Sequence, residues 1–383
     1  MDSKYDFSTL RDFQESLLTF KVPIPGNQCI ATEGYGEIYS HVCGYADLEK
    51  QQPLKGDELY FLWSATKPVT VSLALRLFEE NRFRMNDPLY EYIPEYRNMY
   101  VRKMIDGREE ILSASSDILI WQLFNMTAGI DYEVNTPAVH EVRERTGGRC
   151  PTVETVRAFA KRPLASEPGA YWCYGLCHDV IGALIEIWSG KKLRDYAKEV
   201  LFEPLGMNET SYGYSAEQKD RITAQFSYRY DTETVTRTNN TVNLILGPDY
   251  DSGGAGMVSS LKDFSKFAAV MANHGSAENG YRFLMPETVD MLRTNTLTKQ
   301  EAESFCWEQH KGYGYGYGVR TRLPSPEDDD LDFGWGGAAG AILLMDCDRK
   351  MSLVYLQHLL NNPEDHTFTG MRDRFYESVR KQK

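Results

Sequence analysis

A serine and a lysine lie three residues apart at the start of an apolar stretch, and this is the clearest place for chemistry in the chain. Ser64 and Lys67 belong to FLWSATKPVTVSLALRLFEENR, residues 61–82. If that stretch is a helix, residues three apart share a face, so the amine lies beside the hydroxyl. Free N–H groups and the dipole at a helix N-terminus favour developing negative charge. The pair therefore indicates an activated serine nucleophile.

The pattern Ser-x-x-Lys is weak by itself, because it occurs four times in the chain: Ser64/Lys67, Ser189/Lys192, Ser259/Lys262 and Ser378/Lys381. Only Ser64 stands between a strand-like FLW and a helix that is apolar nearly all round, which predicts a central helix. The plainer interpretation is a helix cap followed by a lysine that extends its amine to solvent. If the pair is catalytic, the lysine acts as a neutral base or stays charged beside a tyrosine that loses its proton. The sequence leaves that choice open.

The elements around this helix predict two lobes. QCIATEGYGEIYSHVCGYAD indicates two strands, as do GYGYGYGVR, which alternates strictly, and AILLMDCDRKMSLVYLQH. SSLKDFSKFAAVMANHG has a serine and an aspartate at its start and a glycine past its end, which is typical of a helix. MRDRFYESVRKQK predicts a closing helix. We expect an α/β lobe from residues 1–82 and 246–383, a mostly helical lobe from 83–245, and the site in the cleft between them.

Composition excludes several classes of function. The chain has 383 residues and a net charge of −13, which argues against nucleic-acid binding. We find no secretory signal and no apolar run that could cross a bilayer, so we expect a cytoplasmic protein without a membrane partner. Cys173, Cys177 and His178 match no zinc-type spacing, and Gly253–Gly256 lacks the lysine of a phosphate-binding loop. We therefore expect no metal and no cofactor, and we leave open a homo-oligomer.

Several segments together resemble one superfamily. SATK, followed by RMNDPLYEYIPEY, ILIWQLFNMTAGI, PGAYWCYGLCHDVIGALIEIWSG, LFEPLGMNETSYG and FGWGGAAGAILLMD, is similar to the serine hydrolases related to penicillin-binding proteins and class C β-lactamases. The likeness covers nearly the whole chain in the right order. It implies an α/β (α+β) two-lobe fold, with an antiparallel sheet flanked by helices and a mostly helical lobe.

The resemblance also implies roles for particular residues. Ser64 matches the family nucleophile, Lys67 the activating lysine, and Tyr174 the second-motif tyrosine that acts as base and then as acid. The third motif falls on Trp335-Gly336-Gly337, which implies substrate contacts there. The oxyanion hole would then be the backbone N–H groups of Ser64 and Ala338.

Departures from the family pattern bear on the substrate. Leu176 stands where β-lactamases of this type carry an asparagine, and Trp335 stands where they carry a lysine that binds the β-lactam carboxylate. The acidic loop SPEDDDLDFGW would repel a carboxylate if it lay near the cleft. With Asp179 as a structural partner of the second motif, these features resemble family VIII carboxylesterases. Leu176 and His178 are further candidates for the substrate pocket.

We therefore expect a serine hydrolase that cleaves small carboxylic esters through an acyl-enzyme on Ser64. A G-x-S-x-G motif, the usual esterase signal, is absent. The shared scaffold keeps β-lactam or D-amino-acid peptide hydrolysis as an alternative, and transfer of the acyl group to another alcohol as a third. The non-enzymatic alternative is a binding or sensor module that kept the fold and lost turnover. The unusual residues Leu176 and Trp335 are the support for it.

Overall fold

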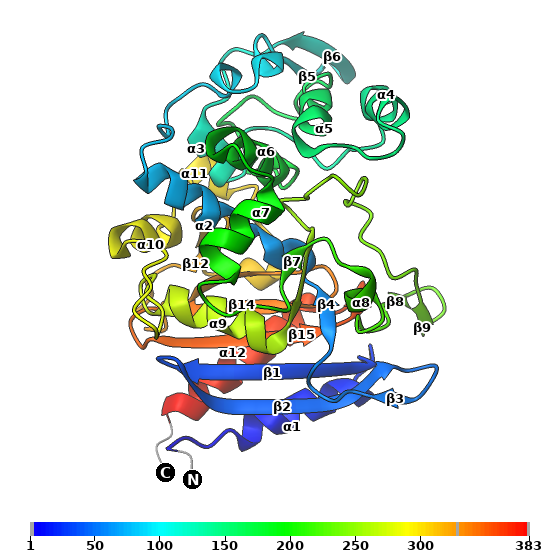
Figure 1. Ribbon diagram of the computed structural model, residues 1–383, viewed down its shortest axis with the longest axis vertical. Coiled ribbons are helices and arrows are strands. Elements are labelled where there is room, and N and C mark those ends of the chain that lie inside the picture. The colour runs from blue at the N-terminus through cyan, green and yellow to red at the C-terminus, as the bar shows by residue number, and fades with distance from the viewer. Residues whose placement is uncertain (1–3, 327–328, 381–383) are drawn as a thin grey trace.

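A computed structural model describes residues 4–326 and 329–380 of the chain. One antiparallel sheet dominates its lower half (Figure 1). Its strands in spatial order are β11 (Tyr313–Tyr315), β12 (Arg320–Arg322), β13 (Phe333–Gly336), β14 (Ile342–Asp346), β15 (Met351–Gln357), β1 (Gly26–Glu33), β2 (Gly36–Asp47) and β3 (Gln52–Pro53).

The two ends of the chain meet in the middle of this sheet. β1 pairs with β15 in a continuous register from Asn27↔Gln357 to Glu33↔Met351. β15 is buried along its whole length and β1 along nearly all of it, because helices cover both faces of the sheet. Strands from both ends of the chain therefore belong to one sheet.

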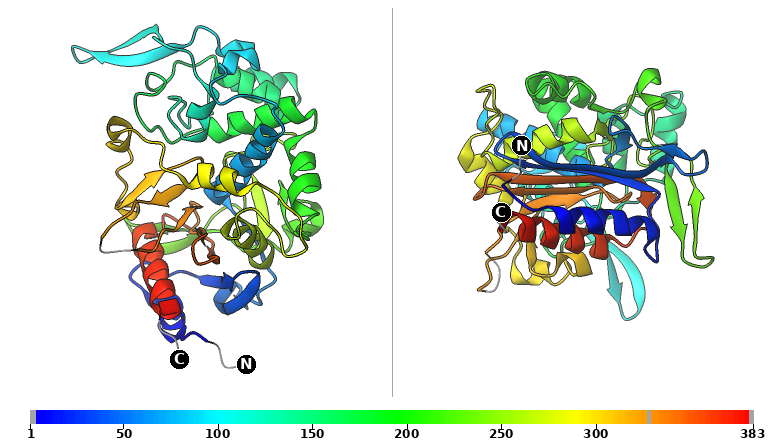
Figure 2. Two further views of the ribbon diagram at one scale, coloured as in Figure 1. Left: turned by 90° about the vertical axis from the view of Figure 1, so that its left-hand side faces the viewer. Right: turned by 90° about the horizontal axis from the view of Figure 1, so that it is seen from below.

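Three helices cover the sheet. α1 (Ser8–Ser16) and α12 (Glu364–Arg380), the first and last helices, lie side by side on one face (Figure 2). α9 (Leu261–Ala272) packs on the other face against β1, β14 and β15. The Ser260 side chain caps α9 by accepting from the Asp263 N–H at 3.2 Å, as its sequence predicts.

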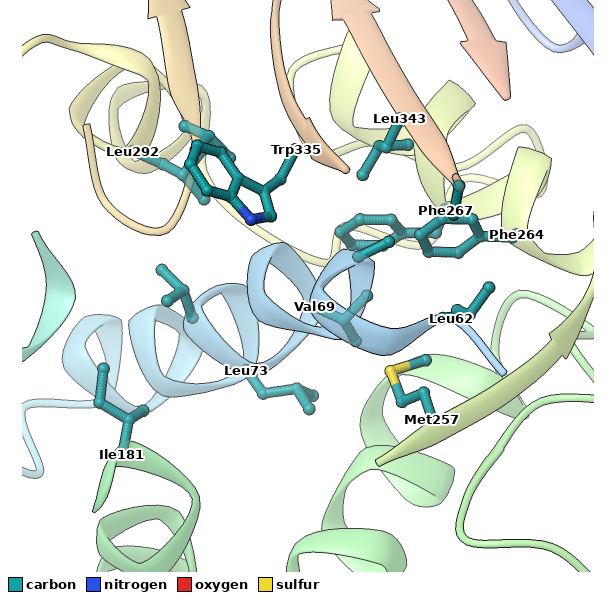
Figure 3. Close-up of a cluster of buried hydrophobic side chains, with 14 of the residues drawn as sticks. Leu62, Val69, Leu73, Ile181, Met257, Phe264, Phe267, Leu292, Trp335 and Leu343 are labelled. Carbon is teal, nitrogen blue, oxygen red and sulfur yellow. The ribbon is translucent and has the colours of Figure 1, made fainter. Parts of the chain in front are cut away.

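α2 (Thr66–Glu79) is the central helix of the molecule. All but three of its residues are buried, which matches an apolar pattern that runs nearly all round the helix. In Figure 3 the α2 residues Val69 and Leu73 lie between Phe264 and Phe267 of α9 on one side and Ile181 on the other. α2 therefore joins the two lobes, and its first turn lies at their boundary.

The second lobe is mostly helical. α6 packs against α2, α3 and α5, and a two-stranded hairpin lies at the far end (Figure 1). Its elements are α3 (Ile120–Phe124), α4 (Pro137–Arg145), α5 (Thr152–Phe159), α6 (Cys177–Ser189), α7 (Leu193–Ala197), β5 (Tyr100–Ile105) and β6 (Arg108–Ser113).

Part of the segment expected in the helical lobe pairs with strands of the α/β lobe. β7 (Ser211–Tyr212) and β4 (Leu59–Phe61) flank β10 (Met257–Ser260). β8 (Phe226–Arg229) lies between β9 (Thr234–Arg237) and β16 (Leu359–Leu360). The remaining helices are α8 (Ala216–Lys219), α10 (Pro286–Arg293) and α11 (Lys299–Ala302). β7, β8 and β9 lie before residue 246, the expected start of the second α/β segment. They are too short to show a periodicity in the sequence.

The alternating segment GYGYGYGVR is two strands rather than one. β11 ends at Tyr315, and a turn closed by a bond from the Gly316 N–H to the Val319 carbonyl, at 2.9 Å, leads into β12. Gly318 has φ of +73°, which breaks an extended chain. α12 likewise begins at Glu364, ahead of the helix expected from Met371. No helix within the described ranges is long and apolar enough to cross a membrane.

Candidate active site

Ser64 lies in a tight turn between β4 and α2. The residue before it, Trp63, has φ of +50°, a left-handed conformation that is uncommon outside glycine. The Trp63 indole N–H donates to Gln225 Oε1 at 2.9 Å and anchors this turn. A short 3₁₀ turn over Trp63–Ala65 then leads directly into α2. Ser64 therefore projects from the start of the central helix.

Lys67 brings three groups together. Its side chain is fully buried, and Nζ donates to Ser64 Oγ at 3.1 Å, Tyr132 Oη at 2.7 Å and the Gly254 carbonyl at 2.8 Å. These bonds match the three donors of an ammonium group. The structure thus joins Ser64 and Lys67 as their spacing predicts, and it adds Tyr132, which the sequence analysis missed.

Tyr174 lies on the other side of Lys67. Lys67 Nζ is 4.7 Å from the centroid of the Tyr174 ring, and the rings of Tyr174 and Tyr132 are 5.4 Å apart. The Tyr174 hydroxyl accepts a hydrogen bond from the Trp335 indole N–H at 2.9 Å. The second and third motifs are therefore linked directly through Tyr174 and Trp335.

Burial controls the charge of Tyr132. Loss of water, together with the nearby Tyr174 and Asp179, raises the pKa of the Tyr132 phenol well above its usual 10. A phenol in that environment keeps its proton at neutral pH. Tyr132 therefore enters the site as a neutral hydroxyl that accepts from Lys67.

The buried carboxylate of Asp179 lies near Lys67. Asp179 Oδ1 accepts from the Tyr250 hydroxyl at 2.9 Å and from Ser252 Oγ at 2.7 Å. Desolvation raises the pKa of Asp179, while these hydrogen bonds and the charge of Lys67 act in the opposite direction. A side chain at Gly254 would place its Cβ 2.5 Å from Asp179 Oδ2, so only glycine fits there.

The third motif forms the opposite wall. Gly337 packs so closely on the Ser64 turn that a Cβ there would lie 2.3 Å from the Leu62 carbonyl oxygen. Asn362 Nδ2 donates to the Ala338 carbonyl at 3.2 Å and holds the segment that follows. This close approach sets residue 338 at the same pocket as Ser64.

A pocket of about 240 Å³ opens beside Ser64. Aromatic side chains dominate one wall, with Trp307 5.1 Å from Tyr174 and His310 5.0 Å from Trp335 between ring centroids. The lining residues are Ser64, Tyr174, Trp307, Gln309, His310, Arg320, Trp335, Gly336, Gly337, Ala338, Gly340, Ala341, Ile342, Asn362, Glu364, Thr367 and Phe368. Of the expected substrate residues, Trp335, Gly336 and Gly337 lie on this wall.

Leu176 and His178 do not line this pocket. Leu176 is 2% exposed at the start of α6, and His178 is fully buried, with Nε2 3.3 Å from the Phe124 carbonyl. Burial and the charge of Lys67 lower the pKa of His178 to about 3. The structure thus gives these two residues a place in the core, where they fix α6, rather than contact with a substrate.

The acidic loop is neutralised by arginines. Glu327 and Asp328 lie outside the described residues. Asp330 pairs with Arg349 at 2.8 Å, and Asp332 pairs with Arg372 of α12 at 2.7 Å. The described carboxylates of this loop therefore face partners away from Ser64, and Asp330 and Asp332 do not line the pocket. Within the described residues, no group of three or more histidine, cysteine and acidic side chains could hold a metal ion.

Comparisons with known proteins identify similar chains and folds. Esterase EstB of Burkholderia gladioli is 28% identical over 279 residues, which are 67% of this chain and 66% of EstB. The chain spans about two thirds of the length of the curated relatives it matches. The solved structure of simvastatin synthase (LovD) from Aspergillus terreus has a TM-score of 0.80 at 20% identity and covers 99% of this chain and 100% of LovD. That of EstCE1, a hydrolase with promiscuous acyltransferase activity, has a TM-score of 0.76 at 21% identity and covers 96% and 97%.

The fold class is thereby confirmed, and the relationship to EstB agrees with the expected likeness to family VIII carboxylesterases. The family model for Beta-lactamase matches residues 13–377, nearly the whole chain. Together with the Ser64–Lys67 contact at the first turn of the central helix, this match shows that the chain belongs to the Beta-lactamase family.

Proposed function

We propose that this chain is a serine hydrolase that cleaves small carboxylic esters through an acyl-enzyme on Ser64. The observation that carries the proposal is the 3.1 Å contact between Lys67 Nζ and Ser64 Oγ at the edge of a mostly aromatic pocket. A lysine beside a hydroxyl at a helix start can help remove the hydroxyl proton as the new bond forms, either as a neutral amine or, when charged, through a neighbouring tyrosine that has lost its proton. Membership of the family and the resemblance to EstB support the same reaction class.

In the first step Ser64 Oγ bonds to the ester carbonyl carbon, and its proton passes to the Lys67 and Tyr174 pair. The backbone N–H groups of Ser64 and Ala338 stabilise the oxyanion, which is worth about 10²–10³ in rate per donor in acyl-transfer sites. The bond to the alcohol oxygen then breaks, and the proton moves to that oxygen. Water then attacks the acyl carbon and gives a proton to the same pair. The bond between the acyl carbon and Ser64 Oγ breaks, Oγ takes that proton back, and the acid is released.

The two tyrosines have different parts in this scheme. Tyr174 lies in the pocket wall, so its hydroxyl can reach the leaving oxygen and carry the proton. Tyr132 lies behind Lys67, where it accepts from Nζ at 2.7 Å. We assign Tyr174 to proton transfer and Tyr132 to holding the amine in place.

The wall of the pocket supports an ester substrate over a β-lactam. Trp335 stands where the related β-lactamases carry a lysine, and its indole bonds to Tyr174 instead. The rings of Trp307 and Trp335, tilted against each other with centroids 6.3 Å apart, offer apolar surface on the pocket wall for an acyl chain or an aryl alcohol. At the position of Trp335 the pocket therefore lacks the cation that binds the β-lactam carboxylate in those enzymes.

The test is hydrolysis of p-nitrophenyl butyrate, nitrocefin and a D-Ala peptide by the wild-type chain and by Ser64→Ala. We expect the ester to be the best substrate and its turnover to require Ser64. Full ester hydrolysis by Ser64→Ala would refute the proposal, and nitrocefin as the best substrate would favour the β-lactamase alternative.

Acyl transfer is a second candidate, because one acyl-enzyme can react with water or with a bound alcohol. It is favoured by the names of two structural neighbours, simvastatin synthase (LovD) and EstCE1, a hydrolase with promiscuous acyltransferase activity. Adding a primary alcohol during turnover of p-nitrophenyl butyrate tests it. An alkyl butyrate that forms in proportion to free butyrate supports transfer, whereas butyrate alone at every alcohol concentration excludes it.

A further inference from the structure

The pocket beside Ser64 contains a buried cation. Arg320 lies on β12, is 3% exposed and lines the same pocket as Ser64. β13 connects the two positions, because Gly334 pairs with Arg320 and the strand then continues through Trp335 to the wall beside Ser64. Arg320 and Ser64 therefore line one pocket, and β13 runs between them.

Arg320 has Tyr313 as a hydrogen-bond partner and the charge of Asp332 nearby, but few direct partners for a buried guanidinium group. It donates from one terminal nitrogen to the Leu343 carbonyl at 3.4 Å, and its carbon Cζ lies 3.8 Å from the centroid of the Phe368 ring. Its Nε is buried without a hydrogen-bond partner, and no described carboxylate forms an ion pair with it. Buried charges are ordinarily paired, because desolvating an isolated ion is costly. Within the described residues, the guanidinium group of Arg320 thus has acidic neighbours but no carboxylate in direct contact.

The titratable side chains that the structure describes near Arg320 do not form an ion pair with its guanidinium group. Asp332 is engaged by Arg372 at 2.7 Å and by the Tyr313 hydroxyl at 2.8 Å. His310 faces the pocket as a neutral ring, because burial and the charge of Arg320 lower its pKa to about 3. Glu364 at the start of α12 also lines the pocket and accepts from Gln309 Nε2 at 3.2 Å. Burial raises the pKa of its carboxyl to about 7, while the charge of Arg320 acts in the opposite direction, and the two side chains form no ion pair.

We propose that Arg320 is an anion subsite and that the preferred substrates are small esters that carry a carboxylate. The substrate carboxylate would form an ion pair with the buried guanidinium group. The inference rests on the proposed esterase function and adds the class of substrate. A guanidinium group binds a carboxylate through two parallel N–H donors, which gives orientation as well as affinity. The carboxylate can belong to the acyl half, as in a half-ester of a dicarboxylic acid, or to the alcohol half.

Two matched pairs of esters separate these sources. Mono-p-nitrophenyl glutarate and the p-nitrophenyl ester of glutaric acid monoamide have the same leaving group, and they differ on the acyl side by a carboxylate against a neutral amide of similar size. 4-Carboxyphenyl butyrate and 4-carbamoylphenyl butyrate differ only in charge on the alcohol side. kcat/KM is measured for each after subtraction of the enzyme-free rate, with the wild-type chain, Arg320→Met, Arg320→Lys and, as a control from the same strand that does not line the pocket, Arg322→Met.

We expect the wild-type chain to prefer the anionic member of at least one pair. Arg320→Met should reduce that preference about 10- to 100-fold, as for the loss of a charge-assisted hydrogen bond. Arg320→Lys should keep part of the preference and Arg322→Met all of it. An equal preference in the wild-type chain and Arg320→Met, or no wild-type preference in either pair, would overturn the subsite.

A second measurement uses the wild-type chain alone, so its result does not depend on whether a variant folds. Glutarate should inhibit hydrolysis of p-nitrophenyl butyrate competitively and more strongly than glutaramide does, and equal inhibition by both would also overturn the subsite. Failure of the esterase proposal has a different signature, since hydrolysis of the neutral esters would then survive in Ser64→Ala.

Discussion

Lys67 Nζ lies 2.7 Å from the hydroxyl of Tyr132 and 3.1 Å from that of Ser64, so the amine is held more closely by a supporting phenol than by the nucleophile. A third bond, to the Gly254 carbonyl at 2.8 Å, fixes it from behind. An amine with a fixed position is ready to exchange a proton with Ser64 as the acyl bond forms.

The two tyrosines should respond differently to the loss of their hydroxyls. Tyr174→Phe removes the proposed proton carrier, so we expect kcat for p-nitrophenyl butyrate to fall about 10²- to 10⁴-fold. Tyr132→Phe removes one acceptor from Lys67 and should cost about tenfold. Steady-state kinetics on both variants checks this. A larger loss in Tyr132→Phe than in Tyr174→Phe would reverse the assigned parts.

The indole of Trp335 should matter through its N–H group. Trp335→Phe keeps an aromatic ring and removes the donor to the Tyr174 hydroxyl, so we expect kcat to fall about tenfold with little change in KM. Trp188→Phe is a matched control, because the Trp188 indole N–H is buried without a hydrogen-bond partner and the ring stacks on Phe83. Equal kcat values for Trp335→Phe and the wild-type chain would show that this bond has no part in turnover.

Gly254 should tolerate no side chain. Gly254→Ala would place a Cβ 2.5 Å from Asp179 Oδ2 and 3.5 Å from Lys67 Nζ, which must displace the support of the amine. We expect kcat to fall at least about tenfold, together with a lower free energy of unfolding. Gly36→Ala, where the new Cβ meets only the Glu33 carbonyl oxygen at 3.6 Å, is the control. Wild-type activity in Gly254→Ala would show that this close approach is not needed.

The lobes and the core of the site could be predicted from the sequence for a physical reason. Helical spacing forces Ser64 and Lys67 onto one face, and an apolar pattern all round α2 requires a central helix. Tyr132 could not be found this way, because it reaches Lys67 through the fold and stands in no motif. Its one signal is its place two residues after the segment ILIWQLFNMTAGI, which ends in a glycine turn.

Other parts of the prediction failed where tertiary contacts decide. Leu176, which stands where related β-lactamases carry an asparagine, and the nearby His178 are predicted to line the pocket, but α6 starts there and both side chains are buried in the core. Arg320 belongs to the alternating segment GYGYGYGVR, which was interpreted as one strand. The turn at Gly316–Val319 folds that segment back, so that Arg320 is brought to the pocket. The cytoplasmic location and the oligomeric state stay predictions.

Buried histidines should make the protein less stable in mild acid. The folded state holds His178 with a pKa of about 3, whereas an unfolded histidine titrates near 6.5. Below pH 6.5 the unfolded chain therefore binds a proton that the folded chain does not, and stability falls as the pH falls towards 3. His178 alone contributes a loss of about 2 kcal/mol between pH 6.5 and 5.

Urea unfolding at a series of pH values checks this, with His178→Gln and the exposed His140→Gln as its control. The free energy of unfolding should depend less on pH in His178→Gln than in the wild-type chain, and His140→Gln should follow the wild type. The same pH dependence in all three proteins would contradict a neutral buried His178.

The most direct test of the central claim is covalent labelling with a p-nitrophenyl alkylphosphonate, whose adduct on a serine does not hydrolyse. Peptide mapping locates the label while esterase activity is followed in the same sample. We predict that one phosphonyl group attaches to Ser64 and that activity is lost in proportion to labelling. Esterase activity that persists when Ser64 is fully labelled, or that disappears with the label on another residue, would contradict the account.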